Sequence, residues 1–380
     1  MIRKLLFMLG LLICAAAFAQ APLPEIDKAL QPYVDNGDLP GMVTIIARRG
    51  EILNVNCVGW QDKEKGIKMS PKTIFWVASQ TKPITATAVM MLVEEGLVKL
   101  DAPVTEYLPE LKNLKVIVKD DANGQTLVKQ TNTMTVRHLL SHTSGMQFLP
   151  GPQTAAGKID LLPFSLGVYG SAATPLLFQP GEGYRYANQD IDAAATILER
   201  VSGMKYEDFV KERIFKPLGM KTATFWPGGK LAKRVVTPYG RDEEGKLVPT
   251  RIKQLQYPLD DRSKRYASAA GGLFCSAEDL SLFYRMIACG GEWNGKRIIS
   301  KKSIREMGTR QTPDTVSDNY GLGWRCFKDG MGHGGAMGTN SRVFTKKGYV
   351  TMYFILQDDL PKRGEAYTSF LRAARAAYKF

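Results

Sequence analysis

The chain has 380 residues, of which 44% are hydrophobic and 23% charged, which is typical of a globular protein with one composite domain or two interleaved ones. Its formal net charge is +14, but the lysine and arginine residues are spread along the whole sequence. Because no basic stripe alternates with aromatic residues, nucleic acid is not an expected partner. We interpret the scattered lysines as an aid to solubility; the alternative is attraction to an anionic surface such as cell wall or lipid headgroups.

The first 19 residues are typical of a secretory signal. Arg3 and Lys4 precede an apolar run over 5–18, and Ala17-Phe18-Ala19 has the small-x-small pattern of a cleavage site. We expect residues 1–19 to be removed and the mature protein to be exported to the periplasm or the exterior; the alternative is a retained membrane anchor. Later apolar runs are shorter than a bilayer is thick, so no integral membrane segment is expected in the mature chain.

The hydrophobic pattern predicts strands near both ends of the chain and helices between them. In chain order, the elements are a hairpin of strands 42–49 and 52–60, helices over 79–95, 191–201, 206–214 and 279–287, a second hairpin of strands 341–344 and 349–357, and a helix over 363–378. Residues 119–134 and 148–178 are typical of long loops, and the second of these is a candidate rim of the substrate site. A sheet assembled from the two chain ends follows from this order.

Cysteine and histidine are scarce in the expected mature chain. Cys57, Cys275, Cys289 and Cys326 are widely spaced, which leaves both disulfides and buried free thiols open. Only three histidines are present, which is too few to favour a histidine-based zinc site. We therefore expect no metal and no cofactor.

The first element with clear chemistry is Ser79-Gln80-Thr81-Lys82, an S-x-x-K sequence followed by Pro83. In the first turn of a helix, residues three apart share a face, so the serine hydroxyl meets the lysine amine. Burial and nearby positive charge lower the pKa of such a lysine, and its neutral amine then takes the hydroxyl proton. A second copy, Ser202-Gly203-Met204-Lys205, contains a glycine at a helix end, and we interpret it as a turn.

Two further elements fit the same chemistry. Tyr186-Ala187-Asn188 is the one Y-x-N sequence in the chain and is predicted on a loop, where a phenol transfers a proton and an amide holds a substrate carbonyl. His333-Gly334-Gly335 precedes the second hairpin, and its small residues let a substrate backbone lie along a strand edge. The signatures of α/β-hydrolases, P-loop enzymes and zinc peptidases are absent from the sequence.

In this order, S-x-x-K, Y-x-N and [K/H]-x-G, the chain resembles the serine β-lactamase and penicillin-binding-protein superfamily, in the branch around class C β-lactamases, D-amino peptidases and esterases. The resemblance extends over most of the mature chain through further blocks: Leu139-Leu140-Ser141-His142-Thr143-Ser144-Gly145, Pro217-Leu218-Gly219-Met220, Ala270-Gly271-Gly272-Leu273 and Tyr320-Gly321-Leu322-Gly323-Trp324. We expect an α/β (α+β) fold in which 24–84 and 265–380 form an antiparallel sheet flanked by helices. Residues 85–264 form an inserted helical domain, and the active site lies between the two.

The resemblance also implies a role for each matching residue. Ser79 would be the nucleophile, Lys82 its general base and Tyr186 the proton shuttle to the leaving group. Asn188 would hold Lys82 or the substrate amide. The oxyanion would be bound by the backbone N–H groups of Ser79 and of Ala336, which is expected on the strand after His333.

The chain departs from the class C pattern where Lys-Thr-Gly is replaced by His333-Gly334-Gly335. A histidine is only partly charged near neutral pH, and Gly334 has no hydroxyl to bind the carboxylate of a β-lactam. This favours esters or peptides over lactams as substrates. Ser317-Asp318-Asn319 spells a motif of other branches and is interpreted as a coincidence, and His142 with Ser144 is interpreted as a capped helix end.

The sequence therefore predicts a serine hydrolase that cleaves an ester, amide or lactam through a Ser79 acyl-enzyme. The substrate would be a small molecule or a peptide, with cell-wall fragments among the candidates, and the sequence does not indicate an oligomeric state. One alternative is a penicillin-binding receptor or D-Ala carboxypeptidase-like protein that deacylates slowly. The other is a cell-wall binding module without catalysis.

Overall fold

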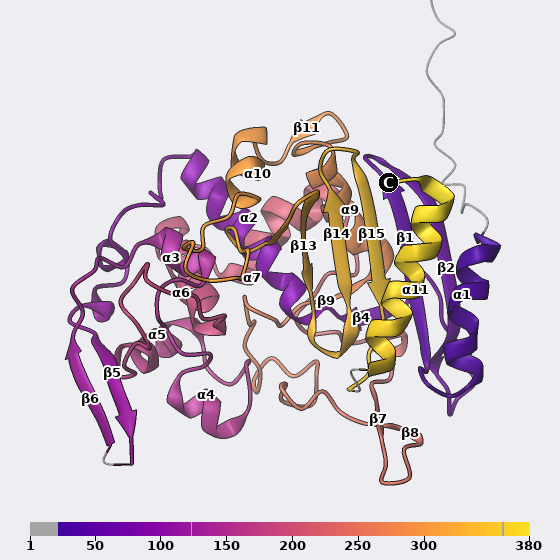
Figure 1. Ribbon diagram of the computed structural model, residues 1–380, viewed down its shortest axis with the longest axis horizontal. Helices are drawn as coiled ribbons and strands as arrows, with labels where there is room; N and C mark the ends of the chain where they lie inside the picture. Colours follow the sequence, from indigo (N-terminus) through magenta and orange to yellow (C-terminus); the bar gives the residue numbers. More distant parts are fainter. Residues whose placement is uncertain (1–21, 123, 359–360) are drawn as a thin grey trace, which may run out of the picture.

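The computed structural model describes residues 22–122, 124–358 and 361–380, so the expected signal segment lies outside the described residues. Within the described part, the core is a seven-stranded sheet in the order β12-β13-β14-β15-β1-β2-β3, and every neighbouring pair is antiparallel. Figure 1 shows how strands from the two chain ends meet at the centre, where β1 pairs with β15. The predicted sheet is confirmed. Its strands are β1 (Gly41–Arg48), β2 (Glu51–Asp62), β3 (Ile67–Lys68), β12 (Arg325–Phe327), β13 (Gly330–Gly334), β14 (Asn340–Phe344) and β15 (Tyr349–Phe354).

Helices cover both faces of the sheet. The terminal helices α1 (Pro24–Asp35) and α11 (Pro361–Tyr378) pack on one face, and α9 (Ala277–Ala288) packs on the other (Figure 1). Successive side chains of β1 point to opposite faces of the sheet, which explains both contacts. Met42 faces the terminal helices, and Val43 faces α9. Burial of each such aliphatic side chain contributes about 1.5–3 kcal/mol.

The middle of the chain is mainly helical, as the sequence predicts. Helix α2 (Thr81–Glu94) is buried on all sides from Thr81 to Leu92, and in Figure 1 it lies between the sheet and the helices of residues 136–202. The further helices are α3 (Val136–Ser141), α4 (Gly151–Ala156), α5 (Phe164–Ala172), α6 (Asn188–Ser202), α7 (Tyr206–Val210), α8 (Lys216–Leu218) and α10 (Lys301–Met307), with a π-helical turn over Lys211–Phe215. Of the described helices, each is too short or too polar to cross a membrane.

Two loop predictions are wrong. Residues 119–134 contribute to a hairpin of β5 (Lys115–Asp121) and β6 (Gly124–Lys129), and residues 148–178 contain α4 and α5. The hairpin is mostly exposed on both faces, so its sequence lacks the period-two burial pattern that marks a strand. The glycines inside α5 lower its helix propensity, so the sequence of this segment does not predict a helix either.

Short strand pairs complete the fold. They are β4 (Ile74–Trp76) with β9 (Phe274–Ser276), β7 (Tyr239–Arg241) with β8 (Leu247–Pro249), and β10 (Glu292–Trp293) with β11 (Lys296–Arg297). The first pair brings the S-x-x-K sequence beside residues 268–273.

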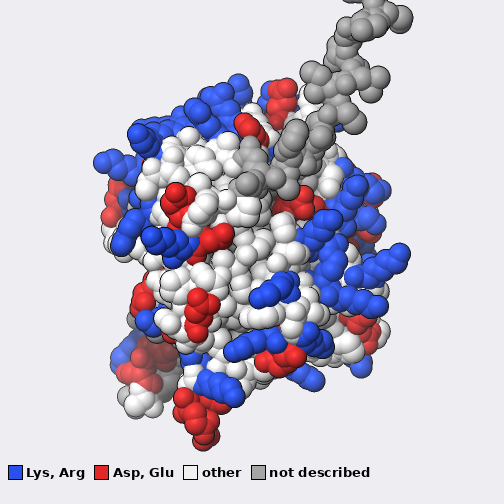
Figure 2. Space-filling model, turned by 90° about the vertical axis from the view of Figure 1, so that its right-hand side faces the viewer, with Lys and Arg blue, Asp and Glu red and all other residues white. Residues whose placement is uncertain are grey.

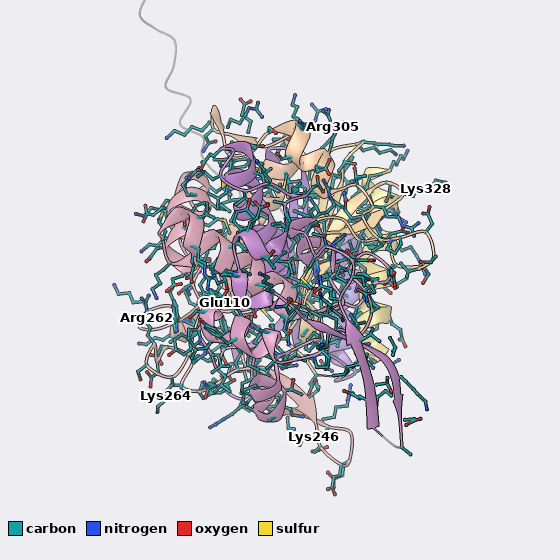
Figure 3. All side chains as sticks on the ribbon, turned by 90° about the vertical axis from the view of Figure 1, so that its left-hand side faces the viewer. Glu110, Lys246, Arg262, Lys264, Arg305 and Lys328 are labelled. Atoms are coloured by element: carbon teal, nitrogen blue, oxygen red, sulfur yellow. The ribbon has the colours of Figure 1, made fainter. Side chains whose placement is uncertain are left out.

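The described structure shows the state of the cysteines and the distribution of surface charge. Among the described residues, the four cysteines are free thiols, so the open choice between thiols and disulfides resolves to thiols. On the face formed by the terminal helices, Lys and Arg side chains are interspersed with Asp and Glu (Figure 2). On the opposite face, labelled charged side chains such as Lys246 and Lys328 lie at the periphery (Figure 3).

Candidate active site

Ser79 lies in a 3-10 turn, Ala78–Gln80, that immediately precedes α2, so the helix begins two residues later than the sequence predicts. Ala78 has a left-handed backbone conformation with φ of 47°, which turns the chain sharply before the serine. The turn is anchored to residues 268–273, because Val77 N donates to Leu273 O at 3.0 Å and Trp76 Nε1 donates to Gly271 O at 2.6 Å. Ser79 itself stays partly exposed.

The Lys82 amine lies directly against this serine. Its Nζ atom is 3.2 Å from Ser79 Oγ, 2.7 Å from Asn188 Oδ1 and 2.8 Å from Ala270 O. The side chain is fully buried, so three hydrogen-bond partners from three segments fix its position. Asn188, the first residue of α6, therefore holds the lysine, which is one of the two roles that the resemblance implies.

Burial is the main influence on the charge of Lys82. The pKa of Lys82 is lowered to about 7, chiefly by burial and to a smaller extent by the Arg325 guanidinium. The carboxylates of Asp192 and Asp190 act in the opposite direction. A large fraction of the amine is consequently neutral near pH 7, with a free lone pair beside Ser79.

Tyr186 lies on the loop before α6, and its ring lies 4.6 Å from Lys82 Nζ. Burial raises the pKa of Tyr186, while a hydrogen bond with the Ser79 hydroxyl lowers it. The phenol therefore stays protonated at neutral pH. A protonated phenol in contact with Ser79 suits proton transfer to a leaving group rather than the first deprotonation.

A buried network of polar side chains packs against the Tyr186 ring. The His142 ring packs against the Tyr186 ring with 4.6 Å between centroids, and His142 Nδ1 lies 3.0 Å from Asp190 Oδ2. Ser144 Oγ donates to the other oxygen of Asp190. Burial raises the pKa of Asp190 well above its usual range, and burial lowers the pKa of His142, which keeps the imidazole neutral. His142 does end α3 with φ of 60°, as the sequence indicates, but the network with Asp190 is not visible in the sequence.

His333 differs from its expected role. Its side chain is only 3% exposed, its Nε2 lies 2.9 Å from the Tyr320 hydroxyl and its Nδ1 lies 2.6 Å from Gly334 O. Burial lowers the pKa of His333 to about 3. The expectation of a partly charged histidine is wrong, because the ring is neutral and hydrogen-bonded inside the protein.

The backbone after His333 forms one side of a candidate oxyanion site. Ala336 is exposed and lies in a 3-10 turn, Ala336–Gly338, so its expected position on a strand is wrong. Among the described residues, the N–H groups of Ser79 and Ala336 donate to no protein acceptor. Thr339 Oγ1 donates to Val77 O at 3.2 Å and thereby ties this turn to the turn that carries Ser79.

Gly335 permits this close approach of the two turns. A Cβ atom on Gly335 would lie 2.3 Å from Val77 O and 2.2 Å from Thr339 Oγ1, so a side chain cannot fit. At Gly334, an added Cβ would lie 3.4 Å from the nearest atom, Asn340 Nδ2, which is an ordinary contact.

Arg325 is a charged residue near the site that sequence reasoning missed. It begins β12, where it pairs with Gly332 in β13, and it forms a bridge with Tyr320. The side chain is exposed, and within the described residues it has no ion-pair or hydrogen-bond partner. Its charge acts on Lys82 and on Tyr186. The sequence signal was its position directly after the Tyr320–Trp324 block.

The remaining motif matches lie apart from this arrangement. Ser202 ends α6, and Gly203 follows with φ of 68°, so the second S-x-x-K is a helix end as predicted. Ser317 and Asn319 are exposed in the loop before β12.

A sheet assembled from both chain ends, with a serine and a lysine one turn apart beside it, defines the β-lactamase and transpeptidase-like class of serine hydrolases. The model of the Beta-lactamase family matches residues 26–375, and the chain belongs to that family. The resemblance inferred from the motifs is confirmed.

Named relatives differ in their activities. The chain is similar to esterase EstB of Burkholderia gladioli, with 33% identity over 281 residues that cover 67% of each chain. It is 26% identical over 333 residues to a putative D-alanyl-D-alanine carboxypeptidase of Salmonella typhimurium, covering 81% of this chain and 73% of that protein. A structure of simvastatin synthase from Aspergillus terreus matches with a TM-score of 0.78 and 21% identity over 94% of this chain and 100% of that one, which shows a shared fold.

Proposed function

We propose that this protein is a serine hydrolase that cleaves esters through an acyl-enzyme on Ser79. The observation that carries the proposal is the 3.2 Å contact between Ser79 Oγ and an amine, Lys82 Nζ, whose pKa is lowered to about 7. A neutral amine in hydrogen-bond contact with a hydroxyl is the arrangement that activates a serine nucleophile.

In the acylation step, the Ser79 hydroxyl proton passes to Lys82 Nζ as the Oγ atom forms a bond to the substrate carbonyl carbon. The carbonyl oxygen gains negative charge and is bound by the N–H groups of Ser79 and Ala336. Each such donor stabilises the transition state by roughly 3 to 4 kcal/mol.

Collapse of this intermediate breaks the bond to the leaving group. Tyr186 gives its phenolic proton to the leaving oxygen or nitrogen and recovers a proton from the Lys82 ammonium. Water then attacks the acyl carbon by the same route in reverse, with its proton taken up through Tyr186 and Lys82, and the acid and free Ser79 are released. Three tightly held partners keep Lys82 in place through both steps.

Esters are favoured over lactams by the last residues of β13. A lactam carboxylate is normally bound by a cation and a hydroxyl, whereas His333 is neutral and buried and Gly334 has no side chain. The esterase named among the relatives supports the same choice.

A second candidate is a penicillin-binding or D-Ala carboxypeptidase-like protein that deacylates slowly. The exposed, unpaired guanidinium of Arg325 favours it, because such a cation attracts a carboxylate near the site. A fluorescent penicillin distinguishes the two, since labelling of Ser79 without later release supports the receptor.

A non-catalytic binding module is the weakest candidate, because it gives no reason for Ser79, Lys82 and Tyr186 to be held in contact. It would be favoured by folded protein that binds peptidoglycan while a fluorophosphonate probe leaves Ser79 unlabelled.

We also propose export to the periplasm or the exterior, which is supported by the pattern of residues 1–19.

The proposal is tested by Ser79→Ala with a panel of a 4-nitrophenyl ester, a D-amino acid amide and a cephalosporin. Ester hydrolysis is expected to fall by about 10³-fold or more, with nearly unchanged thermal stability. Ser202→Ala, in the second S-x-x-K, is the matched control and should keep full activity. Ester turnover by Ser79→Ala at the wild-type rate would refute the assignment.

A further inference from the structure

Asp192 is a carboxylate close to the Ser79–Lys82 pair that the proposed mechanism does not use. It lies one turn into α6, after Asn188, and its Oδ1 accepts a hydrogen bond from Ala270 N at 3.2 Å. The carbonyl of the same residue, Ala270, accepts the bond from Lys82 Nζ at 2.8 Å. One peptide segment therefore connects the carboxylate to the amine.

The segment that contains Ala270 is held in place by α2 as well. Thr85 Oγ1 donates to Ala269 O at 2.7 Å, and Leu273 N donates to Thr81 Oγ1 at 3.3 Å. The Asp192 bond adds a tie from α6, so the Ala270 carbonyl is fixed between the two helices that supply Lys82 and Asn188. Loss of that tie would free one of the three acceptors of the amine.

Asp192 and Asp190 both raise the pKa of Lys82, but their surroundings differ. Asp190 is fully buried and hydrogen-bonded to His142 and Ser144, and its burial raises its pKa well above the usual range while the Ser144 bond lowers it. Asp192 is only partly buried and borders a hollow between α5 and α6 that Phe164 and Gln189 also line. Burial raises the pKa of Asp192 to about 7, and above that pH its carboxylate raises the pKa of Lys82 more than Asp190 does.

Resting on the proposed function, we infer that Asp192 is a positioning residue, which holds the Ala270 segment against Lys82 and places a negative charge behind the amine. Its charge favours the ammonium form of Lys82 and so stabilises the state that follows proton uptake from Ser79. The other groups that face Lys82, from all elements packed around it, are Ser79, Tyr186, His142, Asp190, His333 and Arg325.

The test is the pH dependence of kcat/KM for 4-nitrophenyl acetate in Asp192→Asn, which keeps the size and an acceptor oxygen but removes the charge. Without the negative charge the ammonium form of Lys82 is less stable and the pKa of Lys82 falls. The acidic limb of the profile, where kcat/KM rises with pH, should therefore move to lower pH by about 1 to 2 units. Asp192→Glu should restore the limb toward the wild-type position. Asp208→Asn, an exposed carboxylate on α7, is the control and should leave the limb in place.

The outcomes separate this inference from the proposed function. An unmoved limb in Asp192→Asn, or one moved to higher pH, overturns the role of Asp192 even if Ser79→Ala is inactive. Activity retained by Ser79→Ala overturns the proposed function instead. If Asp192→Asn does not fold, Asp192→Ser gives the same readout, and failure of both variants to fold would show a structural role and reject the inference.

Discussion

The Nζ atom of Lys82 lies 3.2 Å from the Oγ atom of Ser79, although the serine belongs to a 3-10 turn and the lysine to the helix that follows it. The contact holds because both residues are anchored separately, Ser79 through the left-handed Ala78 before it and Lys82 through Asn188 and Ala270. Proton transfer between the two atoms is the step on which the proposed chemistry depends.

The first prediction concerns wild-type activity against pH. Only the neutral amine of Lys82 accepts the serine proton, and the pKa of Lys82 is about 7, so kcat/KM for an ester should rise with pH and level off above about pH 7. Below that value the rate should fall about tenfold per pH unit. A rate that stays constant from about pH 5 to pH 8 would contradict a lysine base.

Arg325→Gln should shift the rise of kcat/KM with pH, the acidic limb of the profile, to higher pH. The guanidinium lowers the pKa of Lys82, so its removal raises that pKa and more of the amine is charged at neutral pH. Because Arg325 is exposed, the shift should be less than about one unit and should shrink as salt is added. Lys328→Gln, in the turn after β12 and at the outer surface in Figure 3, is the matched control.

Gly335→Ala should disable the oxyanion site while leaving most of the fold intact. The added methyl group would overlap Val77 O and push the turn that carries Ala336 away from Ser79. Loss of about 10²- to 10³-fold in kcat is expected, as for removal of one oxyanion donor. Gly364→Ala, in α11 with open space around it, should behave as wild type, and equal activities of the two variants would rule out this role of Gly335.

Gly334→Thr should improve activity on a chromogenic cephalosporin. The position accepts a side chain at ordinary contact distance, and a hydroxyl there gives the lactam carboxylate one hydrogen bond, worth about 0.5–1.5 kcal/mol. A gain of roughly 2- to 10-fold in kcat/KM follows. His333→Lys, which places a second cation in a buried position near Lys82, should instead lower the melting temperature.

A buried ion pair makes a separate prediction about stability. Arg265 Nε lies 2.6 Å from Asp160 Oδ2, and both side chains are at most 1% exposed. Asp160→Ala leaves the guanidinium buried without its partner, which should lower the free energy of unfolding by about 3–5 kcal/mol. Glu95→Ala, which removes an exposed pair with Arg213, should cost much less, and equal losses in a denaturant titration would refute the distinction.

The sequence was sufficient for the four central strands of the sheet, β14, β15, β1 and β2, because they are apolar and bounded by turn residues, and for helices α2, α6, α7, α9 and α11. It did not predict the outer strands β3, β12 and β13. It failed for the β5–β6 hairpin and for α5, where exposure or internal glycines remove the periodic signal. Within the site, Ser79, Lys82, Tyr186 and Asn188 could be found from local motifs. Asp192 could not, because its relation to Lys82 passes through Ala270, which is far away in the sequence.

The charge state of His333 could not be predicted from the sequence either. Its ordinary pKa predicts partial charge, and only the three-dimensional structure reveals that burial, and then the charge of Lys82, lower the pKa of His333 and keep the ring neutral. Burial of a titratable group depends on the whole fold, so motif reasoning identifies such a residue without its protonation state.

The most direct measurement is the mass of the protein after rapid acid quench of its reaction with a slowly deacylated ester, followed by peptide mapping. One acyl group is expected to be added to the protein, on the peptide that contains Ser79. An acyl group on another residue, or ester turnover with no trapped adduct under any quench time, would contradict this expectation.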